Sequence, residues 1–191
     1  LISSISLVRL IAKIFECEKN FFEFISPVEN FLFRFSGIDS KKEMSWKEFL
    51  TALMTINLIW FVYAFVMLMI QGSLPLNPDG NPSMSPDLAF NTAISFLVNC
   101  NLQHYSGETG ATYFSQIFVL MFLQFVSAAT GIAAFAGLLR GLKEKSGDTL
   151  GNFYNYFVKS LTRILLPLCI AVAVILALRG VPMTFEGKFS I

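Results

Sequence analysis

The chain has 191 residues, of which 54% are hydrophobic and only 14% are charged. Soluble domains carry about 25% charged residues, so this composition excludes an ordinary soluble domain and indicates an integral membrane protein. The formal net charge of +1 argues against nucleic acid as a partner. The three cysteines are widely spaced and show no metal-binding or disulfide pattern.

The N-terminal region predicts two segments at the membrane surface. Residues 1–15 are too short to span and place Arg9 and Lys13 on one face, which is typical of an interfacial helix or of the end of an earlier span. Residues 20–38 are amphipathic and rich in aromatic side chains, and we expect them at the interface. Because the chain opens on Leu1 and shows no signal-peptide pattern, we interpret it as a piece of a longer protein.

Two long uncharged intervals follow, and each predicts a membrane-spanning helix. No charged residue lies between Glu48 and Asp79, and Leu50–Ile70 is apolar almost throughout. A helix needs about 20 apolar residues to cross the bilayer core, which this stretch supplies. The second interval, residues 109–139, is long enough to span with tilt.

The second predicted span carries small residues at every fourth position. They are Ala129, Ala133, Gly137 and Gly141. They share one helix face and let another helix approach closely. We expect a partner helix against this face, one that this fragment lacks.

A third span is predicted over Ile164–Leu178, which is apolar apart from Pro167. It is entered past the basic residues Lys159 and Arg163. Pro167 lies in its first turns and predicts either a kink or an early turn.

Basic residues predict which loops face the cytoplasm. Lysine and arginine cluster before the first predicted span and between the second and third, whereas Gly72–Ala111 contains neither. The positive-inside rule places both basic loops in the cytoplasm and Gly72–Ala111 outside. The first two spans therefore form an out-and-back pair, and the external stretch has only Asp79, Asp87 and Glu108 as formal charges.

A short apolar helix is predicted within this external stretch. Ser85 suits the N-cap and Pro86 the first helical position, and the charge of Asp87 favours the helix N-terminus. The run Asp87–Val98 gives about 18 Å of helix, about half of a membrane. A helix that enters and cannot cross must return as non-helical backbone, which needs protein or water around it. The pattern predicts a re-entrant pore loop.

The uncharged polar loop after this half-helix predicts a cation filter. A dehydrated monovalent cation needs several neutral oxygens, which backbone carbonyls supply, and the carboxyl end of the half-helix adds partial negative charge. Asparagine and glutamine side chains can hold the neighbouring backbone or add amide oxygens. Asp79, Asp87 and Glu108 would concentrate cations at the external mouth. The alternative is a helical hairpin whose amides make ordinary turns.

Several short motifs resemble, in order and spacing, the potassium-binding A subunit of the Kdp-type potassium-transporting ATPase of bacteria. The most specific is "NCNLQHYSGE" at Asn99–Glu108. The others are "MSWKEFL" (Met44–Leu50), "LPLNP" (Leu74–Pro78), "NTAISF" (Asn91–Phe96), "SAATGIA" (Ser127–Ala133) and "DTLGNFY" (Asp148–Tyr154). The resemblance covers residues 27–178.

The resemblance implies an all-α integral membrane fold, in which membrane–pore-loop–membrane repeats like those of a potassium channel surround a filter. The chain would supply a truncated N-terminal segment (1–48), the first repeat with its re-entrant half-helix (49–141), and a linker with the first span of the second repeat (142–191). The architecture is therefore incomplete. The filter backbone maps to Val98, Asn99, Cys100 and Asn101, with Gln103 on the external side.

The same resemblance implies what the whole subunit does. It binds external potassium and passes it to the ATP-hydrolysing B subunit of a high-affinity uptake system in the bacterial inner membrane. The implied partners are the rest of its own subunit, the B subunit, small accessory subunits and the lipid bilayer. Potassium is the implied ligand, and ATP is not expected to bind to this chain. We expect these residues alone not to conduct potassium, because one loop forms only part of a filter.

The loop departs from the family pattern Thr-Asn-Thr-Asn-Trp-Gln-Ser. Val98 and Cys100 replace the threonines, Leu102 replaces the tryptophan and His104 replaces the serine. Carbonyl ligands are preserved by Val98 and Cys100, whereas a ligand from a threonine hydroxyl would be lost.

Two other functions compete with this interpretation. A Trk/Ktr-like transporter shares the repeat design, but its pore loops rely on a filter glycine and Val98–Gln103 contains none. If the chain were a structural membrane hairpin, the loop would have no role in ion transport. An enzyme is disfavoured, because the sequence has no nucleophile elbow, P-loop or aspartyl-phosphorylation motif. Outside the loop, a change at Gln71 is expected to have little effect on uptake.

Overall fold

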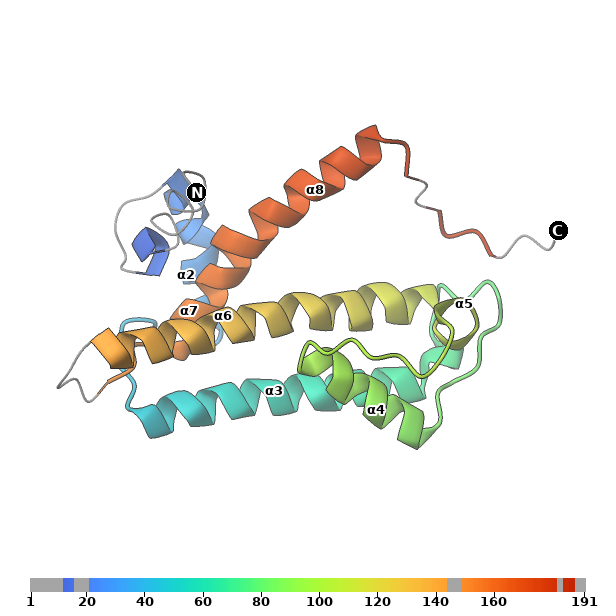
Figure 1. Ribbon diagram of the computed structural model, residues 1–191, viewed down its shortest axis with the longest axis horizontal. Coiled ribbons are helices and arrows are strands. Elements are labelled where there is room, and N and C mark those ends of the chain that lie inside the picture. The colour runs from blue at the N-terminus through green and yellow to red at the C-terminus, as the bar shows by residue number, and fades with distance from the viewer. Residues whose placement is uncertain (1–11, 16–20, 144–148, 182–183, 188–191) are drawn as a thin grey trace. The chain divides into compact units, whose positions relative to one another are not determined.

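The computed structural model describes residues 12–15, 21–143, 149–181 and 184–187 (Figure 1). Within these ranges the residues form helices and loops, and the only β-contact is an isolated bridge between Ser45 and Thr149. The protein is therefore all-α, as predicted.

The chain divides into two compact units. Unit 1 is Leu1–Leu53 with Ala129–Arg179, and unit 2 is Met54–Ala128 with Gly180–Ile191. The candidate filter loop belongs to unit 2, and both of the basic loops belong to unit 1.

Three helices in the described part of the chain are long and apolar enough to cross a membrane. The first is α3 (Trp46–Met69); the second joins the π-helical η3 (Ser115–Met121) to α6 (Phe122–Lys143); the third joins α7 (Phe153–Lys159), the π-helical η4 (Ser160–Leu165) and α8 (Leu166–Leu178). All three coincide with predicted spans, and the protein is an integral membrane protein.

The third helix begins at Phe153, well before the predicted start at Ile164. Asn152 caps it, because the side-chain oxygen of Asn152 accepts a hydrogen bond from the backbone N–H of Asn155 at 3.0 Å. Pro167 does not end the helix. It follows directly on the wide π-helical turn η4, where the backbone hydrogen-bond pattern has already changed.

The N-terminal predictions fall only partly on described residues. Residues 12–15 are helical, and the rest of the predicted segment 1–15 lies outside the described residues. The following residues form η1 (Phe21–Ile25) and α2 (Ser26–Phe35). Helix α2 is amphipathic and exposes Phe31 and Phe35 on its apolar side. Its place at the membrane interface stays a prediction.

A buried ion pair holds basic residues inside the third helix. Arg163 Nε donates to Glu29 Oε1 at 2.8 Å, its Nη2 contacts the other carboxylate oxygen, and the Thr162 hydroxyl donates to Glu29 at 2.6 Å. Burial alone would raise the pKa of Glu29, but the bonds from Arg163 and Thr162 hold that pKa below its ordinary value. The pair fastens α2 to η4, and removing either partner would strand a buried charge.

The stripe of small residues is covered within the chain, which corrects the expectation of a missing partner. Its first two residues are fully buried. A Cβ atom at Gly137 would lie 2.6 Å from the Phe49 ring, and one at Gly141 would lie 2.8 Å from the Leu150 side chain. The stripe therefore packs against the start of α3 and the segment that follows α6 in unit 1.

The segment that precedes α7 also binds the segment that precedes α3. The Asn152 side-chain amide donates to the carbonyls of Asp39 and Lys42, at 3.1 and 2.9 Å. The backbone N–H of Met44 donates to the carbonyl of Gly151 at 2.9 Å. These bonds join two loops that the sequence predicts on the same, cytoplasmic side.

In unit 2, three short helices follow α3 along the chain and precede η3. They are η2 (Gln71–Ser73), α4 (Pro86–Leu97) and α5 (Gly107–Gly110). Figure 1 shows α4 beside α3, and the rings of Phe61 and Phe90 meet edge to face with centroids 5.5 Å apart.

Candidate functional site

The predicted half-helix is present as α4, Pro86–Leu97; it begins at Pro86 as predicted and ends one residue before Val98. Ser85 occupies the N-cap position, but its hydroxyl does not cap the helix. Asp87 lies in the first turn of α4, and its carboxylate interacts with the Ser85 hydroxyl and with the N–H groups of Asp87 and Leu88. These bonds hold the pKa of Asp87 below its ordinary value. The Asp87 carboxylate therefore interacts with the N-terminal end of α4.

The loop after α4 folds back onto Ser95, in the last turn of that helix. The N–H groups of Cys100 and Asn101 donate to the Ser95 carbonyl at 2.9 and 3.2 Å, and the N–H of Leu102 donates to the Ser95 hydroxyl oxygen at 2.7 Å. Three successive backbone amides therefore point toward one residue. Sequence analysis did not single out Ser95, although it is the one hydroxyl residue in the last turn of the half-helix.

This arrangement requires a backbone that alternates in handedness. Asn99 and Asn101 have positive φ angles, 59° and 55°, which asparagine tolerates better than most residues, whereas Cys100 between them does not. The Asn101 side-chain amide also donates to the Asn99 side-chain oxygen at 3.3 Å. The two asparagines therefore fit the turn by their backbone, and one of them braces the other.

The carbonyls of the same loop point the other way. In a trans peptide the C=O and the following N–H are antiparallel, so amides aimed at Ser95 direct the carbonyls of Asn99, Cys100 and Asn101 away from it. Among the described residues no hydrogen bond to these three oxygens is formed. The loop thus presents a row of unoccupied carbonyl oxygens beside the carboxyl end of a helix.

The side chains of the predicted filter are open to their surroundings. Val98, Leu102, Gln103 and His104 are all exposed. Groups of three or more histidine, cysteine, aspartate or glutamate side chains that could hold a metal ion do not occur in the described ranges.

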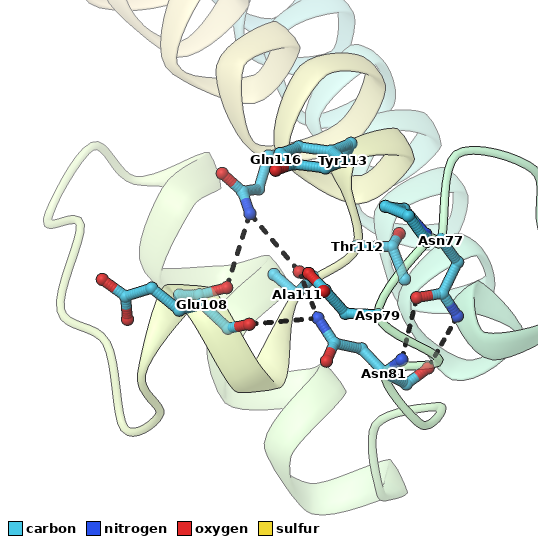
Figure 2. Close-up of a pocket in the computed structure, with 10 residues that line it drawn as sticks. Asn77, Asp79, Asn81, Glu108, Ala111, Thr112, Tyr113 and Gln116 are labelled. Atoms are coloured by element: carbon cyan, nitrogen blue, oxygen red, sulfur yellow. Dashed lines mark hydrogen bonds between the residues drawn. The ribbon is translucent and has the colours of Figure 1, made fainter. Parts of the chain in front are cut away.

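Two of the three predicted mouth residues come together. Asp79 and Glu108 line one cavity of about 230 Å³, shown in Figure 2, whereas Asp87 lies at the start of α4 and does not line it. The other polar side chains of the cavity are Asn77, Asn81, Thr112, Tyr113 and Gln116.

Asn81 connects the two sides of this cavity. Its side-chain amide donates to the carbonyls of Glu108 and Ala111, at 3.3 and 3.0 Å, and Figure 2 shows it reaching across to that segment. Asn77 holds Asn81 in place through two hydrogen bonds, one from the Asn81 N–H at 2.8 Å and one to the Asn81 carbonyl at 2.9 Å. The asparagine of the "LPLNP" motif thus shapes the loop that carries Asn81.

Gln71, where the sequence predicts that a change has little effect on uptake, is a buried and hydrogen-bonded residue. Its side chain is 0% exposed. The amide nitrogen donates to the carbonyls of Pro82 and Gly110, both at 2.8 Å. Sequence analysis missed this role because both acceptors are backbone groups, which leave no trace in a pattern of side chains.

Apolar helices of spanning length, with a half-helix and an uncharged loop between the first two, define a membrane protein of the membrane–pore-loop–membrane type. The chain belongs to the family described as potassium-transporting ATPase A subunit, whose model matches residues 1–191. The family predicted from the motifs is thereby confirmed, and the Trk/Ktr-like alternative falls.

Individual relatives agree with this assignment. A protein from Flavobacterium johnsoniae is 59% identical over 192 residues, covering 100% of this chain and 33% of the relative. One from Bacteroides thetaiotaomicron is 54% identical over 185 residues, covering 97% and 33%, and one from Caldanaerobacter subterraneus is 46% identical over 162 residues, covering 85% and 29%. Each is named potassium-transporting ATPase potassium-binding subunit. The chain spans about a third of the length of these relatives.

Proposed function

We propose that residues 98–103 are one wall of a potassium filter, within a subunit that binds external potassium and translocates it. The observation that carries the proposal is the row of carbonyls of Asn99, Cys100 and Asn101, turned away from Ser95 and free of other partners among the described residues. The names of the relatives support potassium as the ion.

Potassium suits this arrangement for simple electrostatic reasons. The ion exchanges its water for neutral oxygens, which bind strongly enough for entry and weakly enough for release. The carboxyl end of α4 adds partial negative charge without a fixed carboxylate. Asp79 and Glu108 raise the local cation concentration at the cavity that they line. Val98 and Cys100 keep carbonyl ligands, so this design does not depend on threonine hydroxyls.

The remaining parts of the system lie outside this chain. Other loops of the same subunit supply the missing oxygens, an ATP-hydrolysing B subunit receives the ion and supplies the energy, and small accessory subunits complete the complex. The assembly works in the bacterial inner membrane, with this subunit crossing several times. The segments 1–48, 49–141 and 142–191 then correspond to the N-terminal part, the first repeat and the opening of the second.

A pair of substitutions at Asn99 tests the filter assignment in the full-length subunit within its complex. Asn99→Val and Asn99→Gly both remove the side-chain amide, but only valine is incompatible with a φ of 59°. We expect Asn99→Val to raise the potassium concentration for half-maximal uptake, and Asn99→Gly to stay near the parent. Equal uptake affinities for the two variants would refute a filter built on this backbone.

The positions of the basic loops predict that the cavity faces the outside of the cell. Contacts within unit 2 support this prediction. Residues 184–187 come after the third span and should lie outside if 72–111 does. Within unit 2 the Tyr113 hydroxyl donates to the Glu186 carbonyl at 2.5 Å, and the Phe185 ring packs on Tyr113 with centroids 6.0 Å apart. These contacts support the placement of both segments on one side of the membrane.

Cysteine labelling of intact cells measures this orientation. In a background without the native cysteines, Asp79→Cys should react with an impermeant thiol reagent and Lys143→Cys should not. Reaction at Lys143→Cys alone would invert the topology and remove the external mouth.

A further inference from the structure

Two buried side-chain amides hold the segments on either side of the candidate filter. Gln71 is 0% exposed and Asn81 is 8% exposed. Together they donate hydrogen bonds to four backbone carbonyls, those of Pro82, Glu108, Gly110 and Ala111. Neither residue lies in the filter loop, and none of these bonds involves a filter residue.

The four acceptors lie on the two legs of the pore loop. Pro82 precedes α4, so it belongs to the leg that leads into the half-helix. The other three acceptors belong to the leg that leads from the filter to the second span, at and after α5. Gln71 therefore ties both legs to the end of α3, since one amide nitrogen reaches Pro82 and Gly110.

Other contacts also hold the return leg, among them the Tyr113 N–H, which donates to the Leu76 carbonyl at 3.2 Å. Gln116 also donates to the carbonyls of Gly107 and Ala111, but at 3.4 and 3.3 Å, and its side chain is only partly buried. The Tyr105 ring packs on Gly110, where a Cβ atom would lie 2.7 Å away. The bond from Gln71 to the Gly110 carbonyl, at 2.8 Å, fixes this leg shortly before the second span begins.

We infer that Gln71 and Asn81 are positioning residues that determine the ion affinity and selectivity of the filter. The inference rests on the proposed function, because it assigns these amides the task of holding the loop at one distance from the ion path. Groups that orient ion ligands without touching the ion commonly control affinity. The side chains of the loop do not hold its backbone carbonyls rigidly in place. The segments on either side of the loop must therefore hold them.

A merely structural role is the competing explanation, and the chain contains a matched control. Asn152 is 5% exposed and its amide also donates to two backbone carbonyls, those of Asp39 and Lys42. It belongs to unit 1, whereas the filter loop belongs to unit 2. Loss of the Asn152 amide should therefore weaken the fold in a similar way without touching the filter.

The test compares Gln71→Met with Asn152→Leu in the full-length subunit within its complex. The readouts are the potassium concentration for half-maximal uptake, the preference for potassium over rubidium, and the amount of complex in the membrane. We expect Gln71→Met to raise the potassium concentration for half-maximal uptake by about 10- to 100-fold. We also expect it to reduce the preference for potassium over rubidium. Asn152→Leu should lower the amount of complex with unchanged affinity.

A second variant keeps the test decisive if Gln71→Met does not accumulate. Gln71→Asn retains the amide but shortens its reach, and we expect an affinity between those of the parent and Gln71→Met. Parent affinity in whichever variant accumulates would overturn the positioning role. If Asn99→Val shifts affinity and the Gln71 variants do not, only this inference fails; if none of them shifts it, the filter assignment fails as well.

Discussion

Replacement of Gln103 by arginine is expected to raise the potassium concentration for half-maximal uptake by at least about tenfold in the full complex. Gln103 is exposed and lies two residues after Asn101, whose carbonyl is the last of the three that turn away from Ser95. Two unit charges 4 Å apart repel by about 4 kcal/mol at an effective dielectric constant near 20, and solvent at this open position reduces that value. A fixed cation there would oppose ion entry. Uptake kinetics measured over a range of potassium concentrations give the result.

Gln103→Leu is the matched control, because it removes the amide at similar size and adds no charge. We expect its affinity to stay close to that of the parent. Raised ionic strength should also relieve part of the arginine effect, since screening shortens the range of the repulsion. An arginine variant with parent affinity would show that Gln103 does not face the ion path.

Gly151→Ala is expected to destabilise the folded subunit by about 2 to 5 kcal/mol, through backbone strain and overpacking together. Gly151 has a φ of +83°, and a Cβ atom would lie 2.1 Å from the Tyr156 hydroxyl oxygen. The same glycine accepts the hydrogen bond from Met44 that joins the two loops of unit 1. A lower apparent melting temperature of the purified complex, or its loss from the membrane, would report the effect.

Gly131→Ala provides the comparison in the same unit. Gly131 lies inside α6 and no atom lies within 4 Å of an added Cβ atom, so alanine is tolerated and favours the helix. We expect no loss of melting temperature. Equal losses for the two variants would mean that the clash at Gly151 is not what limits stability.

The membrane helices could be predicted from the sequence because their signal is local. Long uncharged runs gave two of the three spans closely, and Pro86 with Asp87 gave the half-helix to within one residue. The start of the third helix was missed because Lys159 and Arg163 look like loop residues in sequence. The buried Arg163 pairs with Glu29, and the distance between them along the chain conceals the pair.

The position of the candidate filter loop could be predicted from the sequence, but the contacts that hold this loop could not. The motif at 99–108 and the neutral loop indicated where carbonyls would be offered. The bonds that hold the loop and the segments on either side of it involve the carbonyl and hydroxyl of Ser95 and the side-chain amides of Gln71 and Asn81. Such bonds have no fixed partner type or spacing, so only the fold reveals them. The partner of the small-residue stripe was hidden for the same reason, since Phe49 meets Gly137 only after folding.

The most direct measurement is the position of bound cations in the full-length subunit within its complex. Thallium, which substitutes for potassium, can be located by anomalous diffraction in crystals grown with it. The filter assignment predicts a thallium peak in contact with the carbonyl oxygens of Asn99, Cys100 and Asn101. Thallium peaks elsewhere in the subunit, with none beside this loop, would contradict it.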